Sequence, residues 1–349
     1  MTSTASVPLA GAGPVEADWA AAEALLRALP STGRVLLVCH VNPDGDALGS
    51  MLGFGLGLRQ FGLSDVRATF PGPPEVPEPF RGLPGLELLV PADAADPAPD
   101  LVICFDAASE SRLGELAGRL STAGAALVLD HHASNPGFGT VNLVDPGAAA
   151  TSVVAEQLLT RLGVVADAAI AECLYVALTT DTGSFRFEAT TPAVHQMAAR
   201  LLATGISPGD ISRRVFDTRP FGAVRLFGAV LGRARLEPKA ASGRGLVWTF
   251  ATLDDLAEHD QRPYVLEALI DSVRCTAEAD VACVLKQSAP TEWAVSMRSK
   301  GAVDVSRVAV ALGGGGHRFA AGFTGRGAVE RVVDSIRAQL DAALIRSDR

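Results

Sequence analysis

The segment from Val35 to Gly62 places the strongest constraint on the fold. It begins with a short apolar run, Val35 to Val38, continues through a polar turn, and ends with an apolar stretch that stops at Gly62. Apolar side chains at positions 48, 51, 52 and 56 recur at helical spacing, and glycine commonly ends a helix. The segment therefore predicts a buried strand, a turn and a helix, as in an α/β sheet.

The turn carries three side chains that could bind a metal ion. His40, Asp44 and Asp46 follow one another closely in the sequence. Carboxylates held together disfavour ionisation unless a cation is present. Carboxylate oxygens combined with an imidazole suit Mn²⁺ or Fe²⁺ better than a pure Ca²⁺ site. The same residues also fit a plain Pro-Asp-Gly turn with an aspartate at the helix N-terminus, so the turn alone leaves both interpretations open.

Two further apolar runs end in acidic residues. Leu101 to Phe105 is followed by Asp106, and Ala125 to Leu129 is followed by the triplet Asp-His-His at 130–132. Ligands of an open parallel α/β sheet gather at the carboxyl ends of its strands. We therefore expect these acids and histidines to lie beside His40 and the aspartates of the first turn.

Asp181 is a further acidic candidate. It lies where a helix predicted from about Asp167 runs into the segment Thr179 to Phe185. An Asx-turn at a helix end would explain the same residue without any ligand. The patterns also predict helices at residues 16–29, 151–162 and 192–205.

The C-terminal part of the chain has a different pattern. It predicts strands near 245–250, 280–286 and 293–298, and helices from about 254 and over 303–312. The last of these strands ends at Arg298, and four consecutive glycines, Gly313 to Gly316, precede His317. Such a run can present N–H groups to an anion, although it is also common in flexible loops. No Gly-Lys-Ser/Thr follows the glycines, so they do not form a P-loop.

Composition limits the class of protein. A chain of 349 residues is long enough for two domains, and its net charge of −9 argues against binding long nucleic acid through many phosphates. Any polyanionic substrate should therefore be short. The five cysteines form no CxxC pair, which excludes a thiolate zinc site of that type. The chain has neither a long apolar run nor a signal-peptide pattern, so we expect a soluble, cytoplasmic protein that does not bind membranes.

Five motifs in this order resemble those of the DHH phosphoesterase family. They are the stretch His-Val-Asn-Pro-Asp-Gly-Asp at 40–46, Asp106, the triplet at 130–132, Asp181 to Phe185, and Gly313 to His317. The resemblance extends from about residue 30 to residue 340. It is strongest to the NrnA-like branch of bifunctional oligoribonucleases and 3′-phosphoadenosine 5′-phosphate (PAP) phosphatases, which includes phosphodiesterases of linear and cyclic dinucleotides.

The resemblance implies an α/β fold with two domains. An N-terminal tail and helix at residues 1–30 would precede a mostly parallel-sheet DHH domain with flanking helices at 31–205. A helical linker at 206–235 would lead to a smaller α/β DHH-associated domain at 236–349, which binds substrate, with a cleft between the domains. We also expect a homodimer.

The resemblance also assigns metal ligands. The matching residues are His40, Asp44, Asp46, Asp106, His131 and Asp181. Asp106 would bridge two ions, with His40 and Asp44 on the first ion and the other three residues on the second. The implied cofactors are two Mn²⁺ ions per chain, with Co²⁺ or Mg²⁺ as alternatives. Such a pair suits in-line displacement at phosphorus.

Further residues match positions that act on the substrate. His132 would face the scissile phosphate, where it could stabilise charge or protonate the leaving oxygen. Asp130 would orient an imidazole. The residues that would hold the substrate are Arg298, Gly315, Gly316 and His317.

The implied function is a two-metal phosphodiesterase and phosphatase. Its substrates would be short RNA, dinucleotides such as pApA, cyclic di-AMP and PAP, and its partners would include no long nucleic acid and no membrane. Two alternatives remain open. One is a DHH-type inorganic pyrophosphatase or exopolyphosphatase, which shares the metal site, and the other is a catalytically silent nucleotide-binding regulator.

Overall fold

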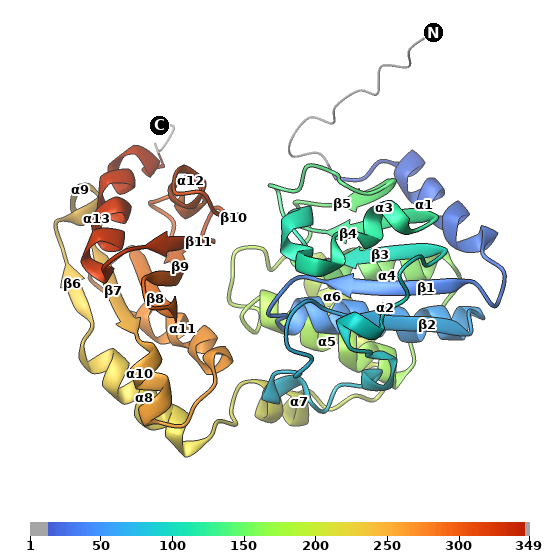
Figure 1. Cartoon of the computed structure of the whole chain (residues 1–349), viewed down its shortest axis with the longest axis horizontal. Coiled ribbons are helices and arrows are strands. Elements are labelled where there is room, and N and C mark those ends of the chain that lie inside the picture. Colours follow the sequence, from blue (N-terminus) through green and yellow to red (C-terminus); the bar gives the residue numbers. More distant parts are fainter. Residues whose placement is uncertain (1–12, 346–349) are drawn as a thin grey trace, which may run out of the picture. The chain divides into compact units, whose positions relative to one another are not determined.

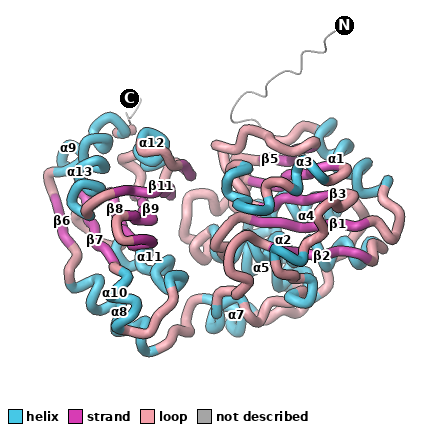
Figure 2. The backbone as a smooth tube through the Cα atoms, viewed as in Figure 1, coloured by secondary structure: helices cyan, strands magenta, loops and turns pink. Residues whose placement is uncertain are grey.

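The computed structural model describes residues 13–345 (Figure 1). Its contacts divide the chain into two compact units between Thr218 and Arg219. This point lies within the segment 206–235 that the sequence predicts as a linker, so that helix α7 (Pro208–Val215) belongs to the first unit and α8 (Phe221–Gly232) to the second. Each unit has its own β-sheet (Figure 2). No described helix combines the length and the apolar character needed to span a bilayer.

The first unit contains a five-stranded sheet in which every strand pair is parallel. Across the sheet the strands are β2 (Asp65–Thr69), β1 (Arg34–Cys39), β3 (Leu101–Phe105), β4 (Ala125–Asp130) and β5 (Val141–Val144). The predictions of β1, β3 and β4 are confirmed, whereas the edge strands β2 and β5 were not predicted. Because the strands are parallel, the carboxyl ends of β1, β3 and β4 share one edge of the sheet.

Two cores lie on opposite faces of this sheet. On one side pack α1 (Glu16–Ala28), α2 (Gly45–Phe61), α4 (Thr151–Arg161), α5 (Ala168–Asp181), α6 (Pro192–Leu202) and α7, together with the 3₁₀ segments η1 (Glu78–Phe80) and η2 (Leu86–Leu88). On the other side pack η3 (Ala92–Ala94), η4 (Glu110–Leu116) and α3 (Arg119–Thr122). Along β1, Leu37 packs into a core shared with α2, α4 and α5, whereas Leu36 and Val38 pack with Leu113 of η4. Alternate side chains thus anchor both layers.

Helices α2 and α5 pack closely enough that α2 requires glycine at their contact. A Cβ atom at Gly49 would clash with the backbone oxygen of Cys173 and would lie 2.9 Å from the Cβ of Ala177. Asp46 lies in the first turn of α2, and Asp181 is the last residue of α5. The separation of these helices therefore sets the positions of two candidate ligands.

We expect Gly49→Ala to destabilise the protein by about 1–3 kcal/mol, because the obstructing atoms belong to the backbone of α5 and the helices must move apart. The free energy of unfolding, measured in urea without added metal, checks this. The control is Gly228→Ala in α8, where no heavy atom lies within 4 Å of the added Cβ. That change should stabilise the helix by up to about 1 kcal/mol. A Gly49→Ala protein as stable as the parent would contradict the prediction.

The second unit contains a mixed six-stranded sheet. Across it the strands are β10 (Gly315–His317), β11 (Ala320–Arg326), β9 (Glu292–Ser299), β8 (Val281–Ala289), β7 (Leu246–Ala251) and β6 (Arg235–Glu237). The pair β7 and β8 is parallel, and the other pairs are antiparallel. The predictions of β7, β8 and β9 are confirmed.

The sheet of the second unit is also covered on both faces. Its helices are α8, α9 (Ala240–Gly243), α10 (Leu253–Glu258), α11 (Leu269–Val273), α12 (Val305–Ala311) and α13 (Val329–Leu340), with 3₁₀ segments η5 (Pro263–Ala268) and η6 (Asp341–Ala343). Trp248 and Met297 pack with α12 and α13 on one face. Val247 and Val284 pack with α8, α10 and α11 on the other. Together with the first sheet, this confirms the predicted α/β fold.

The glycine run is an ordered part of this second sheet. Gly315 and Gly316 pair with β11. A Cβ atom at Gly314 would clash with the backbone oxygen of Gly322, and one at Gly316 would lie 2.6 Å from the Cα of Ala321. The structure thus gives these glycines a packing role against the neighbouring strand, which a flexible loop would not have.

Candidate metal centre

The candidate ligands of the first unit meet at the carboxyl edge of its sheet. His40 follows β1, Asp44 and Asp46 begin α2, Asp106 follows β3, Asp130 ends β4 and precedes His131 and His132, and Asp181 ends α5. All of these residues were predicted from the sequence. The convergence that we expected from parallel strands is therefore present.

The turn after β1 satisfies both interpretations that the sequence left open. Asp44 is the N-cap of α2, and its Oδ1 accepts a hydrogen bond of 3.0 Å from the backbone N–H of Ala47. Its other oxygen, Oδ2, lies 3.8 Å from Nε2 of His40. One carboxylate can therefore cap the helix and still offer an oxygen to a metal ion.

The first group of possible ligands consists of His40, Asp44 and Asp106, which lie close enough together to hold one ion. Nε2 of His40 lies 3.4 Å from Oδ2 of Asp106. Asp106 is only 3% exposed and has a left-handed backbone with φ of 55°. Aspartate adopts this conformation more readily than most residues. The sharp turn at the end of β3 directs its carboxylate into the site.

The second group shares Asp106 with the first. Asp46, Asp106 and His131 are also close enough to hold one ion. Nε2 of His131 lies 3.5 Å from Oδ1 of Asp106, 3.8 Å from Oδ2 of Asp46 and 3.2 Å from Oδ2 of Asp181. The two oxygens of Asp106 therefore face different histidines, Oδ2 toward His40 and Oδ1 toward His131.

Asp46 is held by groups that the sequence analysis did not identify. Its Oδ2 accepts from the backbone N–H of Thr151 at 2.6 Å, and its Oδ1 accepts from the N–H of Ser152 and the hydroxyl of Ser50. The hydroxyl of Thr151 also donates to Asp106. Ser50 could have been recognised from its i+4 spacing on α2. Thr151 could not, because only the tertiary fold brings the start of α4 to Asp46.

The charges at this edge favour divalent cations. Burial alone would lower the pKa of His40, but its contacts with Asp106 and Asp44 outweigh burial and raise the pKa to about 10. Burial and the nearby charge of Asp106 raise the pKa of Asp46 to about 7. The carboxylates thus attract protons onto the imidazoles. A metal ion supplies the same positive charge and leaves the imidazole nitrogens as ligands, so carboxylate and imidazole donors in this arrangement fit divalent transition metals.

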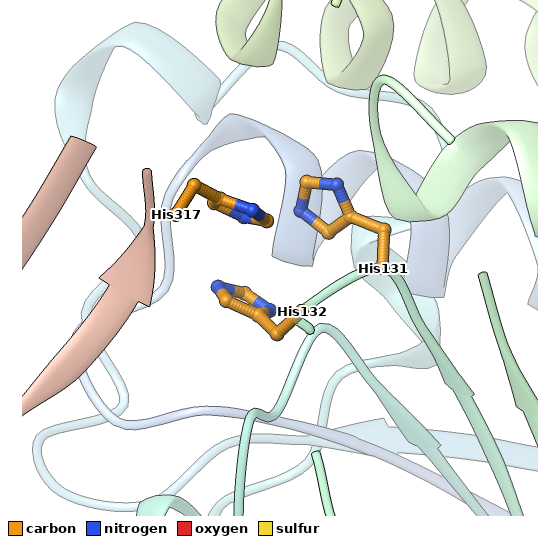
Figure 3. A group of neighbouring side chains, drawn as sticks. All are labelled: His131, His132 and His317. Atoms are coloured by element: carbon orange, nitrogen blue, oxygen red, sulfur yellow. The ribbon is translucent and has the colours of Figure 1, made fainter. Parts of the chain in front are cut away.

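His132 is arranged differently from His131 (Figure 3). Both extend from the end of β4, with ring centroids 4.9 Å apart and rings edge to face. Nδ1 of His132 bonds to Oδ1 of Asp130 at 2.8 Å, while Asp130 is fully buried and also accepts from Asn135. Burial alone would lower the pKa of His132, but the hydrogen bond to Asp130 and the nearby charge of Asp106 outweigh burial and raise this pKa. Asp130 is therefore placed to orient the ring of His132, and its role in the reaction stays a prediction.

The predicted substrate-holding residues belong to the second unit. Arg298 of β9 pairs with Ala320 of β11, and Ala320 pairs with His317 of β10. Directly opposed residues of neighbouring strands point to the same face. Arg298, Ala320 and His317 thus form one row across the sheet, beside Gly315 and Gly316 of β10. The small side chain of Ala320 separates the two larger ones.

Comparisons with known proteins identify two domains in this chain. Residues 34–178 match the model of the DHH family N-terminal domain, and residues 248–345 match that of the DHHA1 domain. The chain is 35% identical over 321 residues to the "bifunctional oligoribonuclease and PAP phosphatase NrnA" of Thermus thermophilus, which covers 89% of this chain and 91% of the relative. A protein of the same name from Bacillus subtilis is 26% identical over 312 residues, covering 85% and 91% of the two chains.

A solved structure supports the fold. A protein from Bacteroides fragilis described as exopolyphosphatase-related superposes with a TM-score of 0.81 and 24% identity, and the match covers 94% of this chain and 96% of that one. The two domain matches occur in the same order as the two units of the structure. The chain therefore belongs to the DHH family, with that family's N-terminal domain followed by a DHHA1 domain.

Proposed function

We propose that this chain is a metal-dependent phosphoesterase that hydrolyses short oligoribonucleotides and dinucleotides to mononucleotides and converts PAP to AMP. The position of Asp106 carries the proposal, because its two oxygens face two separate groups of histidine and aspartate. The names of the Thermus and Bacillus relatives support the substrate class. They also favour it over the pyrophosphatase and exopolyphosphatase alternative.

The donor set fits two divalent cations, which we propose are Mn²⁺, with Co²⁺ or Mg²⁺ as substitutes. His40, Asp44 and Asp106 would hold the first ion. Asp46, His131 and Asp181 would hold the second, together with Asp106. When bound, the ions supply Lewis-acid chemistry and neutralise charge at the phosphate.

The protein itself supplies a proton at the leaving group. Hydrolysis joins a water oxygen to phosphorus, releases a proton from that water to solvent, and breaks the bond to the leaving oxygen, which must gain a proton. We propose that Nε2 of His132 donates this proton and is then reprotonated from solvent. Asp130 accepts from Nδ1 at 2.8 Å, which holds the ring in one orientation and stabilises its charged form. Asp130 is thus a positioning residue for His132.

A second phosphate of the substrate would bind to the row formed by Arg298, Ala320 and His317. The planar guanidinium of Arg298 can donate two parallel hydrogen bonds to phosphate oxygens, and His317 lies on the same face of the sheet. The N–H groups of Gly315 and Gly316 could add to this anion site. A short phosphorylated nucleotide carries two phosphates, one for the metal ions and one for the row of Arg298, Ala320 and His317.

We expect Arg298→Ala and His317→Ala each to raise KM for pApA by about tenfold or more, the scale of one lost charge-assisted hydrogen bond. Hydrolysis of bis-p-nitrophenyl phosphate should change little, because that ester has no second phosphate. Steady-state kinetics on both substrates provides the measurement. Arg326→Ala is the control, since this exposed arginine of β11 pairs with Glu292 of β9, at the end of β9 away from Arg298. An equal loss of kcat/KM on pApA and on bis-p-nitrophenyl phosphate would contradict the proposed contact with the second phosphate.

The substrate class is tested by measuring kcat/KM with Mn²⁺ for pApA, PAP, cyclic di-AMP, a 24-mer RNA and pyrophosphate. We expect pApA and PAP to be hydrolysed. The kcat/KM for pApA should be well above that for the 24-mer, because an acidic protein offers few phosphate contacts to a long strand. Preference for pyrophosphate would support the alternative enzyme. Bound metal without turnover of any substrate would support a silent regulator.

A further inference from the structure

Arg112 lies beside the candidate metal centre in the first unit and is not part of the ligand set. It belongs to η4, which Leu113 and Leu116 anchor in the core beneath the sheet. Its backbone oxygen accepts from the N–H of Val41 at 2.9 Å, which ties η4 to the turn after β1. The backbone position of this exposed arginine is therefore fixed next to His40.

The side chain of Arg112 shares one nitrogen of His40 with a carbonyl group. Nη2 of Arg112 lies 3.1 Å from Nδ1 of His40, and the backbone oxygen of Val41 lies 2.8 Å from the same Nδ1. A guanidinium only donates and a carbonyl only accepts, so a single Nδ1 atom cannot satisfy both. When Nε2 of an imidazole binds a cation, Nδ1 keeps the proton and donates it, here to Val41. The guanidinium of Arg112 then has N–H groups available for another acceptor.

The surroundings of Arg112 favour an anion as that acceptor. All three lysines, at 239, 286 and 300, lie outside the first unit. Several other arginines of this unit pair with carboxylates, such as Arg34 with Asp100 and Arg200 with Glu156, whereas Arg119 and Arg186 donate to backbone oxygens. Within residues 13–345, Arg112 forms no ion pair, and its guanidinium contacts Nδ1 of the candidate ligand His40. It is therefore a cation placed at the metal centre without a carboxylate to neutralise it.

We propose that Arg112 binds the phosphate group that is being hydrolysed. This inference rests on the proposed phosphoesterase function and adds a residue to it. The planar fork of arginine matches two phosphate oxygens, and a fixed cation at the phosphoryl group stabilises the charge that develops there. Arg112 would therefore act on every phosphate ester that the site accepts, in contrast to Arg298, which we assign to the second phosphate.

The test compares Arg112→Gln and Arg112→Lys with the parent. Metal content is measured by ICP-MS, and binding of inorganic phosphate to protein loaded with stoichiometric Mn²⁺ is measured by calorimetry. We expect Arg112→Gln to keep its metal, to bind phosphate about tenfold or more weakly, and to lose about 10- to 100-fold in kcat/KM on both pApA and bis-p-nitrophenyl phosphate. Arg112→Lys keeps the positive charge but lacks the planar guanidinium. Its phosphate affinity and its kcat/KM should lie between those of Arg112→Gln and those of the parent.

Arg67→Gln is the matched control, because it removes the same charge from an exposed arginine of β2 that pairs with Asp65. Arg67→Gln should leave the metal content, the phosphate affinity and the kcat/KM on both esters unchanged. Loss of metal from Arg112→Gln would show that Arg112 only orients His40, and unchanged phosphate binding would also overturn the proposal. If the parent hydrolyses neither ester, the proposed function fails, and the phosphate titration still decides the role of Arg112.

Discussion

Asp106→Ala should abolish hydrolysis of pApA, with kcat reduced by about 10³-fold or more, because both candidate ions lose a shared ligand. The two oxygens of Asp106 face His40 and His131 at 3.4 and 3.5 Å, so its removal affects both groups of ligands. Metal content per chain, measured by ICP-MS after gel filtration, should fall together with activity. The parent protein should likewise lose activity in EDTA and regain it with Mn²⁺.

Asp100→Ala is the control for this change. Asp100 immediately precedes β3, at the opposite end of the strand that Asp106 follows, and it pairs with Arg34 at the surface. Losing that solvent-exposed pair should change stability little and should leave kcat and metal content unchanged. Full activity of the parent after EDTA treatment, or normal metal content in Asp106→Ala, would contradict the shared-ligand interpretation.

His132→Ala should separate chemistry from metal binding. We expect it to retain the metal content of the parent while kcat falls by about 10²-fold or more, the usual scale for a positioned acid or base. The physical reason is that Nδ1 of His132 bonds to buried Asp130, so that the ring is oriented independently of the ions. ICP-MS and single-turnover kinetics on pApA provide the two measurements.

A competing role for His132 is also testable. Its Nδ1 lies 3.5 Å from Oδ1 of Asp106, and these two residues with Asp130 form a group that could itself hold an ion. If His132→Ala loses an equivalent of metal, His132 belongs to the ligand set. His259→Ala is the control, because this histidine ends α10 in the second unit and contacts the backbone oxygen of Asp255.

The central strands of the first unit could be predicted from sequence, and its edge strands could not. β1, β3 and β4 are continuous apolar runs because both faces of each strand are buried. β2 contains two charged residues in five, and β5 is only four residues long. An edge strand pairs with one neighbour only and is partly buried. It therefore needs no continuous apolar run, and its sequence gives little basis for predicting a strand.

Prediction of the candidate site from the sequence was also incomplete. His40, Asp106 and Asp181 were recognised because they follow apolar runs or helices whose ends have a defined place in an α/β sheet. Thr151 and Arg112 were missed because their relation to the site depends on where α4 and η4 pack. The glycine run was recognised, but its packing against β11 was not, since the contact with Gly322 exists only once the sheet has formed.

The row across the second sheet has a consequence for how such enzymes can diverge. Ala320 stands between Arg298 and His317, and the six predicted metal ligands belong to the other unit. A larger residue at position 320 would narrow the space between the two side chains and leave every ligand in place. Under the function proposed above, single substitutions on one sheet could therefore change which nucleotides are accepted, while the proposed metal ligands beside the other sheet stay unaltered.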